Sequence, residues 1–215
     1  MRNETPSGVV THHNLISCID ELSLQDYDDL TDCTRLSTSS ADLAHNRFGN
    51  SQSWLDEYVR TLMFLGWSLH DGAITTRTRV TVSGSIADFL VQRAQTMNPR
   101  QGNAMIDTLD ALVSDQPAVL SLDEESLKGQ RFQVAPSRYD SSGNLHMAIF
   151  NLELVANTAQ SRFLFWPWDN QSAKLVQQSA FLKLNRNVLD TKRAFMATKL
   201  RDKIMKRFAL RRRQP

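Results

Sequence analysis

The stretch 145-LHMAIFNLELV-155 decides the fold that we expect, because it is apolar at odd and even positions alike. Successive side chains of a β-strand point to opposite faces, so Ile149 and Phe150 would lie on different sides of a sheet. A strand with two apolar faces has to be covered on both. The stretch therefore predicts a central strand with helices packed on the sheet. A face left uncovered would instead serve assembly or membrane contact.

Neighbouring apolar stretches extend this strand into a sheet over residues 131–184. Turn-forming residues separate them, and their spacing fits an antiparallel sheet rather than β-α-β units with parallel strands. The further strands that we expect are 131–135, 162–166 (limited by Pro167) and 175–184.

The first half of the chain is predicted to be mainly helical. Its apolar residues recur every three or four positions, which is the repeat of an amphipathic helix. A hairpin over 67–82, with its turn at Asp71-Gly72, interrupts the helices and would extend the sheet. The helical stretches that we expect are 14–22, 24–43 with a break at the poor helix formers 37–40, 53–65, and a helical hairpin over 85–114.

Together these patterns predict an α+β protein, in which N-terminal helices and a long C-terminal helix flank an antiparallel sheet. Residues 1–13 are polar and are expected to form a flexible N-terminus. We expect one domain over 14–210, divided into a helical part (14–114), a sheet (131–184) and a basic C-terminal helix (187–210).

A helical motif and two later motifs carry a resemblance to known proteins. Trp54, Tyr58, Leu62 and Leu65-Gly66-Trp67 follow the pattern W-x3-Y-x3-L-x2-LGW. A late Leu164-Phe165-Trp166 strand follows, and Leu184-Asn185 then leads into a closing helix. This order resembles a group of small, uncharacterised microbial proteins over roughly residues 50–205. The resemblance implies a shared fold and no known activity.

The composition excludes several classes of protein. Of 215 residues, 41% are hydrophobic and 22% are charged, which is typical of a folded domain and not of a disordered chain. Two cysteines, Cys18 and Cys33, are too few for a disulfide scaffold, and the sequence leaves open whether they pair. The N-terminus lacks the apolar region of a cleaved signal peptide. We therefore expect a cytoplasmic protein, or one exported without such a signal.

The charge is distributed unevenly along the chain. The net charge is +2, but the segment from Arg186 to Pro215 holds eleven basic and two acidic residues. The rest of the chain is acidic. Such a basic segment either binds the acidic body of its own chain or contacts an external polyanion, such as nucleic acid or anionic lipid.

The basic segment also carries an apolar stripe from Leu189 to Phe208, which predicts a cationic amphipathic helix. Its cations are the expected anion-contacting residues: Arg186, Lys192, Arg193, Lys199, Arg201, Lys203, Lys206, Arg207, Arg211, Arg212 and Arg213. The stripe and two interface-type tryptophans form the expected apolar interface: Trp166, Trp168, Met196, Leu200, Ile204 and Phe208. The alternative for each set is ordinary packing in the core.

The sequence contains no recognisable catalytic or metal-binding motif. No glycine-rich phosphate loop, HExxH, GxSxG or EF-hand pattern is present. The histidines are scattered, and the clustered acids fall on predicted polar helix faces or turns. We therefore expect no catalytic residues, no metal site and no cofactor, and a protein that is not an enzyme.

The function that we expect is non-enzymatic binding and assembly at an anionic membrane surface, in the manner of a small toxin or effector. It depends on the basic amphipathic helix and the tryptophans around Pro167. A homo-oligomer or a partner protein is possible in this role. The alternative is a nucleic-acid-binding accessory protein that uses the same basic helix.

Overall fold

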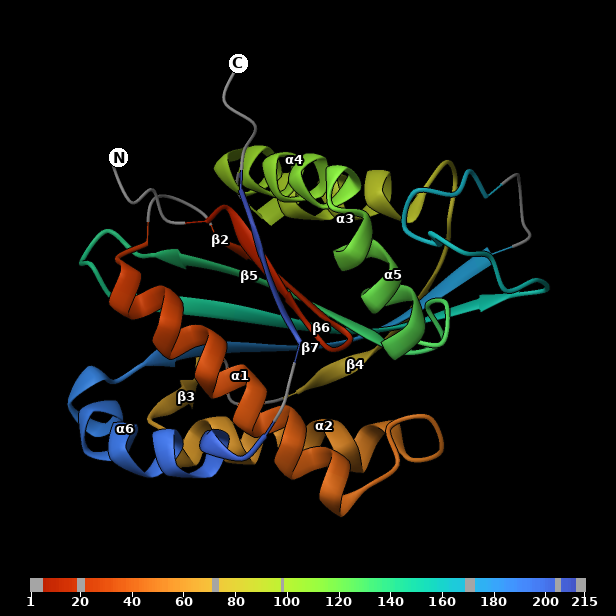
Figure 1. Cartoon of the computed structure of the whole chain (residues 1–215). Helices are drawn as coiled ribbons and strands as arrows, with labels where there is room; N and C mark the ends of the chain where they lie inside the picture. The colour runs from red at the N-terminus through yellow and green to blue at the C-terminus, as the bar shows by residue number, and fades with distance from the viewer. Residues whose placement is uncertain are drawn as a thin grey trace.

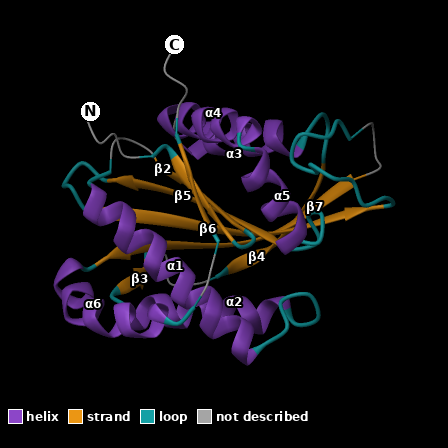
Figure 2. Cartoon of the chain, viewed as in Figure 1, coloured by secondary structure: helices purple, strands orange, loops and turns teal. Residues whose placement is uncertain are grey.

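The computed structural model describes residues 6–18, 22–70, 74–97, 99–168, 173–203 and 206–211, and all structural statements below concern these residues. They form a mixed sheet of eight strands between two layers of helices (Figures 1 and 2). All pairs of neighbouring strands are antiparallel except β2 with β5. The predicted α+β class is confirmed. The strands are β1 (Gly8–Thr11), β2 (Asn14–Cys18), β3 (Trp67–Leu69), β4 (Thr75–Thr81), β5 (Phe132–Tyr139), β6 (Leu145–Ala156), β7 (Ala173–Leu184) and β8 (Arg207–Leu210).

Six helices cover the two faces of this sheet, three on each (Figure 1). One layer consists of α1 (Leu24–Ala44), α2 (Ser51–Phe64) and α6 (Arg186–Arg201). The other consists of α3 (Ile86–Met97), α4 (Pro99–Ser114) and α5 (Gln116–Glu125), and its first two helices form the predicted helical hairpin. Each layer encloses its own hydrophobic core against the sheet.

Strand β6 lies at the centre of the sheet, as its sequence predicts. Met147 and Ile149 belong to the core under α1, α2 and α6, whereas Leu152 and Leu154 belong to the core under α3, α4 and α5. The strand order is β3-β7-β6-β5-β2-β1-β8, and β4 pairs with a second part of the β7 edge. The prediction of a hairpin over 67–82 was wrong, because β3 and β4 both pair with β7, one after the other along its edge, and not with each other. The predicted turn residues Asp71 and Gly72 lie outside the described residues.

The predictions for the N-terminus were wrong. Residues 8–11 form the buried strand β1 rather than a flexible start, and residues 14–18 form strand β2 rather than a helix. The side chains of Val9 and Val10 are fully buried, and those of Leu15 and Ile16 are too. Strand β2 pairs in parallel with β5, a partner more than a hundred residues away. This long-range pairing overrides the helix-like spacing of the local sequence.

Three further predictions need correction. Helix α1 runs unbroken through residues 37–40, because Thr38 is buried and accepts a hydrogen bond from the Asn14 side chain at 3.0 Å. Residues 162–166 form turns rather than a strand, although Phe163 and Leu164 are in the core. The helix predicted over 187–210 ends at Arg201, and residues 207–210 instead form the edge strand β8, which pairs with β1.

The motif around Trp54 and Gly66 sets the position of α6. Trp54 and Tyr58 stack in the core with ring centroids 5.2 Å apart. Gly66 has a φ of +102°, which L-residues with a side chain rarely adopt. Its carbonyl accepts a hydrogen bond of 2.8 Å from the backbone of Asn185, the N-cap of α6. A Cβ at this position would lie 3.0 Å from the Asn185 carbonyl oxygen, so glycine permits this close approach.

We predict that Gly66→Ala destabilises the protein more than Gly143→Ala does. Both glycines have a positive φ, but a Cβ at position 143 would meet nothing within 4 Å. Gly143→Ala should cost about 1–2 kcal/mol from the left-handed conformation alone. Gly66→Ala should cost at least about 1 kcal/mol more, because backbone atoms of the α6 N-terminus must move. Urea unfolding of both variants measures the difference, and equal losses would contradict this account of Gly66.

Candidate functional site

Helix α6 docks on α1 through arginine–carboxylate pairs. The Arg186 guanidinium binds both carboxylate oxygens of Asp26, one of them at 2.9 Å. Arg193 binds both oxygens of Asp29, at 3.0 and 2.7 Å. In β8, Arg207 pairs with Asp28 at 2.8 Å. Three of the cations expected to contact an external anion therefore bind the first turns of α1 instead.

Burial makes the first of these pairs important for stability. The side chain of Asp26 is only 2% exposed. Burial by itself would raise its pKa, but hydrogen bonds from Arg186, Tyr139 and Ser23 outweigh this effect and lower the pKa below the usual aspartate value. The hydrogen bond to Asp26 in turn raises the pKa of Arg186. Both groups therefore stay charged at neutral pH.

The expected apolar interface is largely inside the protein. Met196 and Leu200 are buried against the other helices of their layer, and the Met196 sulfur lies 3.7 Å from the Cys33 thiol. Trp168 is buried too, and its indole donates to the Phe163 carbonyl at 3.1 Å. Phe208 in β8 is half-buried against the opposite core. Ile204 lies outside the described residues, and of the expected set Trp166 is exposed. The prediction that the Met196–Leu200 seam and Trp168 face outward was therefore wrong.

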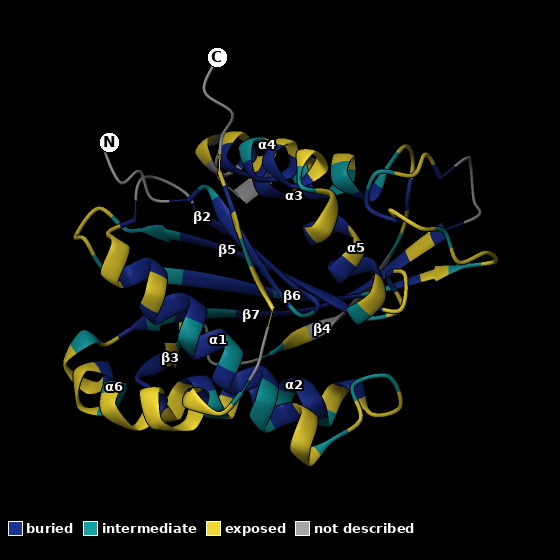
Figure 3. Cartoon of the chain, in the orientation of Figure 1, coloured by how far each residue is buried: buried dark blue, intermediate teal, exposed yellow. Residues whose placement is uncertain are grey.

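A different apolar surface lies on the outer side of α2 and α6. Phe64 is 50% exposed and Phe195 is 40% exposed, and their rings meet edge to face with centroids 5.6 Å apart. The Lys192 Nζ atom lies 4.3 Å from the Phe64 ring centroid, and the Lys199 Nζ atom lies 5.7 Å from that of Phe195. Figure 3 shows this outer side of α6 as largely exposed. We call this surface the α2–α6 patch and define it by Met63, Phe64, Val188, Lys192, Phe195 and Lys199.

The remaining expected cations have varied surroundings. Arg201 and Lys206 are exposed, and so is Arg211. The Lys203 ammonium donates to the Ser39 hydroxyl of α1. Arg212 and Arg213 lie outside the described residues.

Sequence reasoning missed the two exposed phenylalanines. It placed the functional face of the C-terminal helix on its apolar stripe, which includes Met196, because a continuous stripe is the stronger pattern. Phe195 lies off that stripe, three positions after Lys192 and four before Lys199. An aromatic residue off the apolar stripe, between lysines at helical spacing, is the signal that could have identified it.

The described residues hold no obvious site for metal or thiol chemistry. Within them, no three His, Cys, Asp or Glu side chains come together in a way that could hold a metal ion. Cys18 and Cys33 are both free, which answers the question of their pairing. Burial raises the pKa of each thiol to about 12, so both remain protonated at neutral pH. None of the helices in the described part of the chain has the length and apolar character needed to cross a membrane.

No protein-family model matches the chain, and no curated protein sequence matches it. Two solved structures are similar in outline. One is the structure of the Evf virulence factor, with a TM-score of 0.46 and 8% sequence identity. The match covers 94% of this chain and 84% of that one. A delta-endotoxin has a TM-score of 0.44 and 10% identity, covering 81% of this chain and 84% of that one. Similarities at this level carry no argument about function.

We predict that Asp26→Asn lowers the free energy of unfolding at neutral pH and makes it less sensitive to acidic pH. The folded-state pKa of Asp26 is depressed, so its stabilising effect is present above the ordinary value of 3.8 and is lost as the pH falls through the lower folded-state pKa. Losing this charge-assisted pair should cost about 1.5–3 kcal/mol at pH 7 and less at pH 2.

Denaturant unfolding at both pH values measures this effect. Asp190→Asn is the matched control, because this aspartate of α6 also pairs with an arginine but is largely exposed. Its effect should stay within about 0.5 kcal/mol at pH 7. An equal loss for Asp26→Asn at pH 7 and pH 2 would contradict the role assigned to the pair.

Proposed function

We propose that this protein binds anionic membrane surfaces peripherally, through the α2–α6 patch. The observation that supports this proposal is the exposed edge-to-face pair of Phe64 and Phe195, with a lysine ammonium over each ring. Aromatic side chains partition into the apolar boundary of a bilayer, and lysines extend their charged ends toward the headgroups. The patch combines both properties on the outer side of one helical layer.

The energetics of the patch favour weak binding that assembly would strengthen. Burying the exposed half of each phenylalanine contributes about 1 kcal/mol. Each lysine near an anionic surface contributes about 1 kcal/mol more. A total of about 4 kcal/mol corresponds to a Kd near 1 mM for one copy. Several copies held together would bind far more tightly, because each added contact becomes intramolecular.

We further propose that the protein is non-enzymatic and toxin- or effector-like, and that it binds the membrane and then assembles there, because the weak binding of one copy would be strengthened by assembly. A second copy of the chain is the partner that we propose for assembly. Nucleic acid is the weaker alternative for two reasons. Three arginines of the basic segment already pair with α1 carboxylates, and phosphate binding gives no role to the exposed phenylalanines.

We predict that the chain sediments with phosphatidylserine-containing vesicles at low salt, and much less with phosphatidylcholine vesicles. The double variant Phe64→Ser/Phe195→Ser should weaken partitioning at least about tenfold, because it removes about 2 kcal/mol of apolar transfer. Lys192→Gln/Lys199→Gln should weaken it to a similar extent and should also reduce the salt dependence.

Matched controls come from the opposite helical layer. Leu120 is 60% exposed on α5, and Lys128 is exposed just beyond that helix, so Leu120→Ser/Lys128→Gln makes the same kinds of change away from the patch. Thermal unfolding confirms that each variant is folded. Absence of wild-type binding, or equal losses in control and patch variants, would overturn the proposal. Salt-sensitive binding to duplex DNA that survives the serine variant would favour the nucleic-acid alternative.

A further inference from the structure

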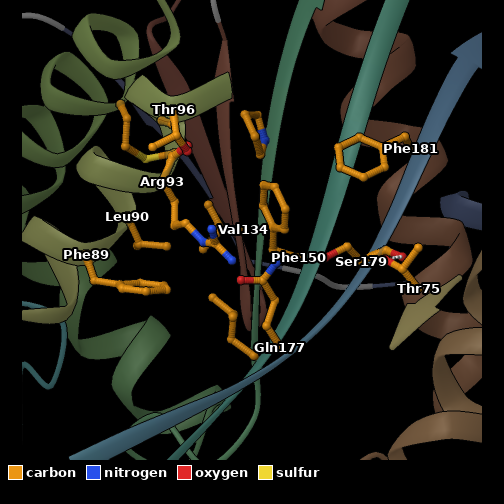
Figure 4. A pocket seen from close by; sticks show the side chains of 14 residues that line it. Thr75, Phe89, Leu90, Arg93, Thr96, Val134, Phe150, Gln177, Ser179 and Phe181 are labelled. Atoms are coloured by element: carbon orange, nitrogen blue, oxygen red, sulfur yellow. Dashed lines mark hydrogen bonds between the residues drawn. The ribbon is translucent and has the colours of Figure 1, made fainter. Parts of the chain in front are cut away.

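A cavity of about 300 Å³ lies on the other side of the sheet, between α3 and strands β4 to β7 (Figure 4). The helix and the sheet both contribute to its apolar wall. Phe89 and Leu90 come from α3, and Val134, Phe150 and Phe181 come from the strands. The volume is at the lower end of the range of about 300–1,000 Å³ found for small-molecule sites. Thr75, Arg93 and Thr96 are exposed, which places the mouth of the cavity at these residues.

The cavity has a polar floor within an otherwise apolar sheet face. Gln177, Ser179 and Phe181 occupy every second position of β7, so their side chains all lie on this face of the sheet. Ser179 is 6% exposed. Its hydroxyl accepts a hydrogen bond of 2.8 Å from the Gln177 amide, which leaves the hydroxyl proton available. No acceptor for that proton is found among the described residues.

Arg93 supplies a positive charge at this cavity. Its side chain projects from α3 toward the strands, into the cavity (Figure 4). The guanidinium carbon lies 6.0 Å from the Phe89 ring centroid. Unlike Arg186 and Arg193, it forms no ion pair with a carboxylate of the described residues. Arg93 and the Ser179 hydroxyl thus line the same cavity, and a cation without a carboxylate partner and a buried hydroxyl with a proton to donate can both bind an acidic group.

We propose that this cavity binds an amphiphile with one carboxylate headgroup and a medium-length hydrocarbon chain. Arg93 and the Ser179 hydroxyl bind the carboxylate, and the chain lies over Phe150 and Phe181 in the apolar part of the cavity. This site is independent of the α2–α6 patch, because the two occupy different helical layers. A soluble monomeric ligand tests it without any membrane.

The test is isothermal titration calorimetry with decanoate, 1-decanol and decyltrimethylammonium, each below its solubility or micelle limit. Decanoate should bind at one site per chain, and at least tenfold more tightly than the alcohol or the ammonium compound. Arg93→Met keeps the apolar stem and removes the charge, so it should weaken decanoate binding at least tenfold. Ser179→Ala should weaken it severalfold. Arg60→Met is the matched control on the exposed surface of α2 and should leave binding unchanged.

The outcomes separate this site from the proposed membrane surface. Phe64→Ser/Phe195→Ser should bind decanoate like the wild type, whatever it does on vesicles. Failure of decanoate to bind, equal binding of decanoate and decanol, or unchanged binding in Arg93→Met would each overturn the inference. Failure of vesicle sedimentation alone would leave the cavity proposal supported by the calorimetry.

Discussion

The ion pairs between α1 and α6 constrain every role that the basic C-terminal segment can have. Asp26 and Asp29 are almost fully buried, and they bind Arg186 and Arg193 through both carboxylate oxygens. A buried carboxylate without its arginine would cost several kcal/mol. The arginines are therefore held on the protein's own body, and the buried seam of α6 is held inward with them. What remains for an external partner is the opposite side of the helix.

The sheet could be predicted where its sequence pattern is local. Strand β6 is apolar at odd and even positions because it is covered on both faces, and the helical hairpin of α3 and α4 follows a regular repeat. Strands β1 and β2 escaped prediction because they are short, and because each needs, besides the other, a second partner far along the chain. Strand β8 escaped prediction because the apolar repeat of α6 continues into its sequence without a break.

The sequence predicted which helix carries the candidate site, but not which face of that helix is exposed. Charge balance indicated that α6 binds something negative, and α1 turns out to supply much of that negative charge. An apolar stripe predicts burial and surface contact equally well, and only the packing of α6 against its own layer separates the two. The arginines and the lysines of α6 also make different kinds of contact. Arginines form the two-pronged buried pairs, whereas Lys192 and Lys199 lie over exposed rings.

The two proposed sites follow from one architectural feature, the presence of a helical layer on each face of a single sheet. In the α1–α2–α6 layer, the ion pairs hold α6 against α1. The surface that remains available to a partner is therefore the outer one, at Phe64 and Phe195. The opposite layer leaves space underneath, where α3 stands away from β7 and the floor is lined by Gln177 and Ser179. Buried polar groups in a sheet core are costly unless something satisfies them. Gln177 and Ser179 meet part of this requirement by hydrogen-bonding to each other, and the Ser179 proton and the Arg93 charge remain available to a ligand in the cavity.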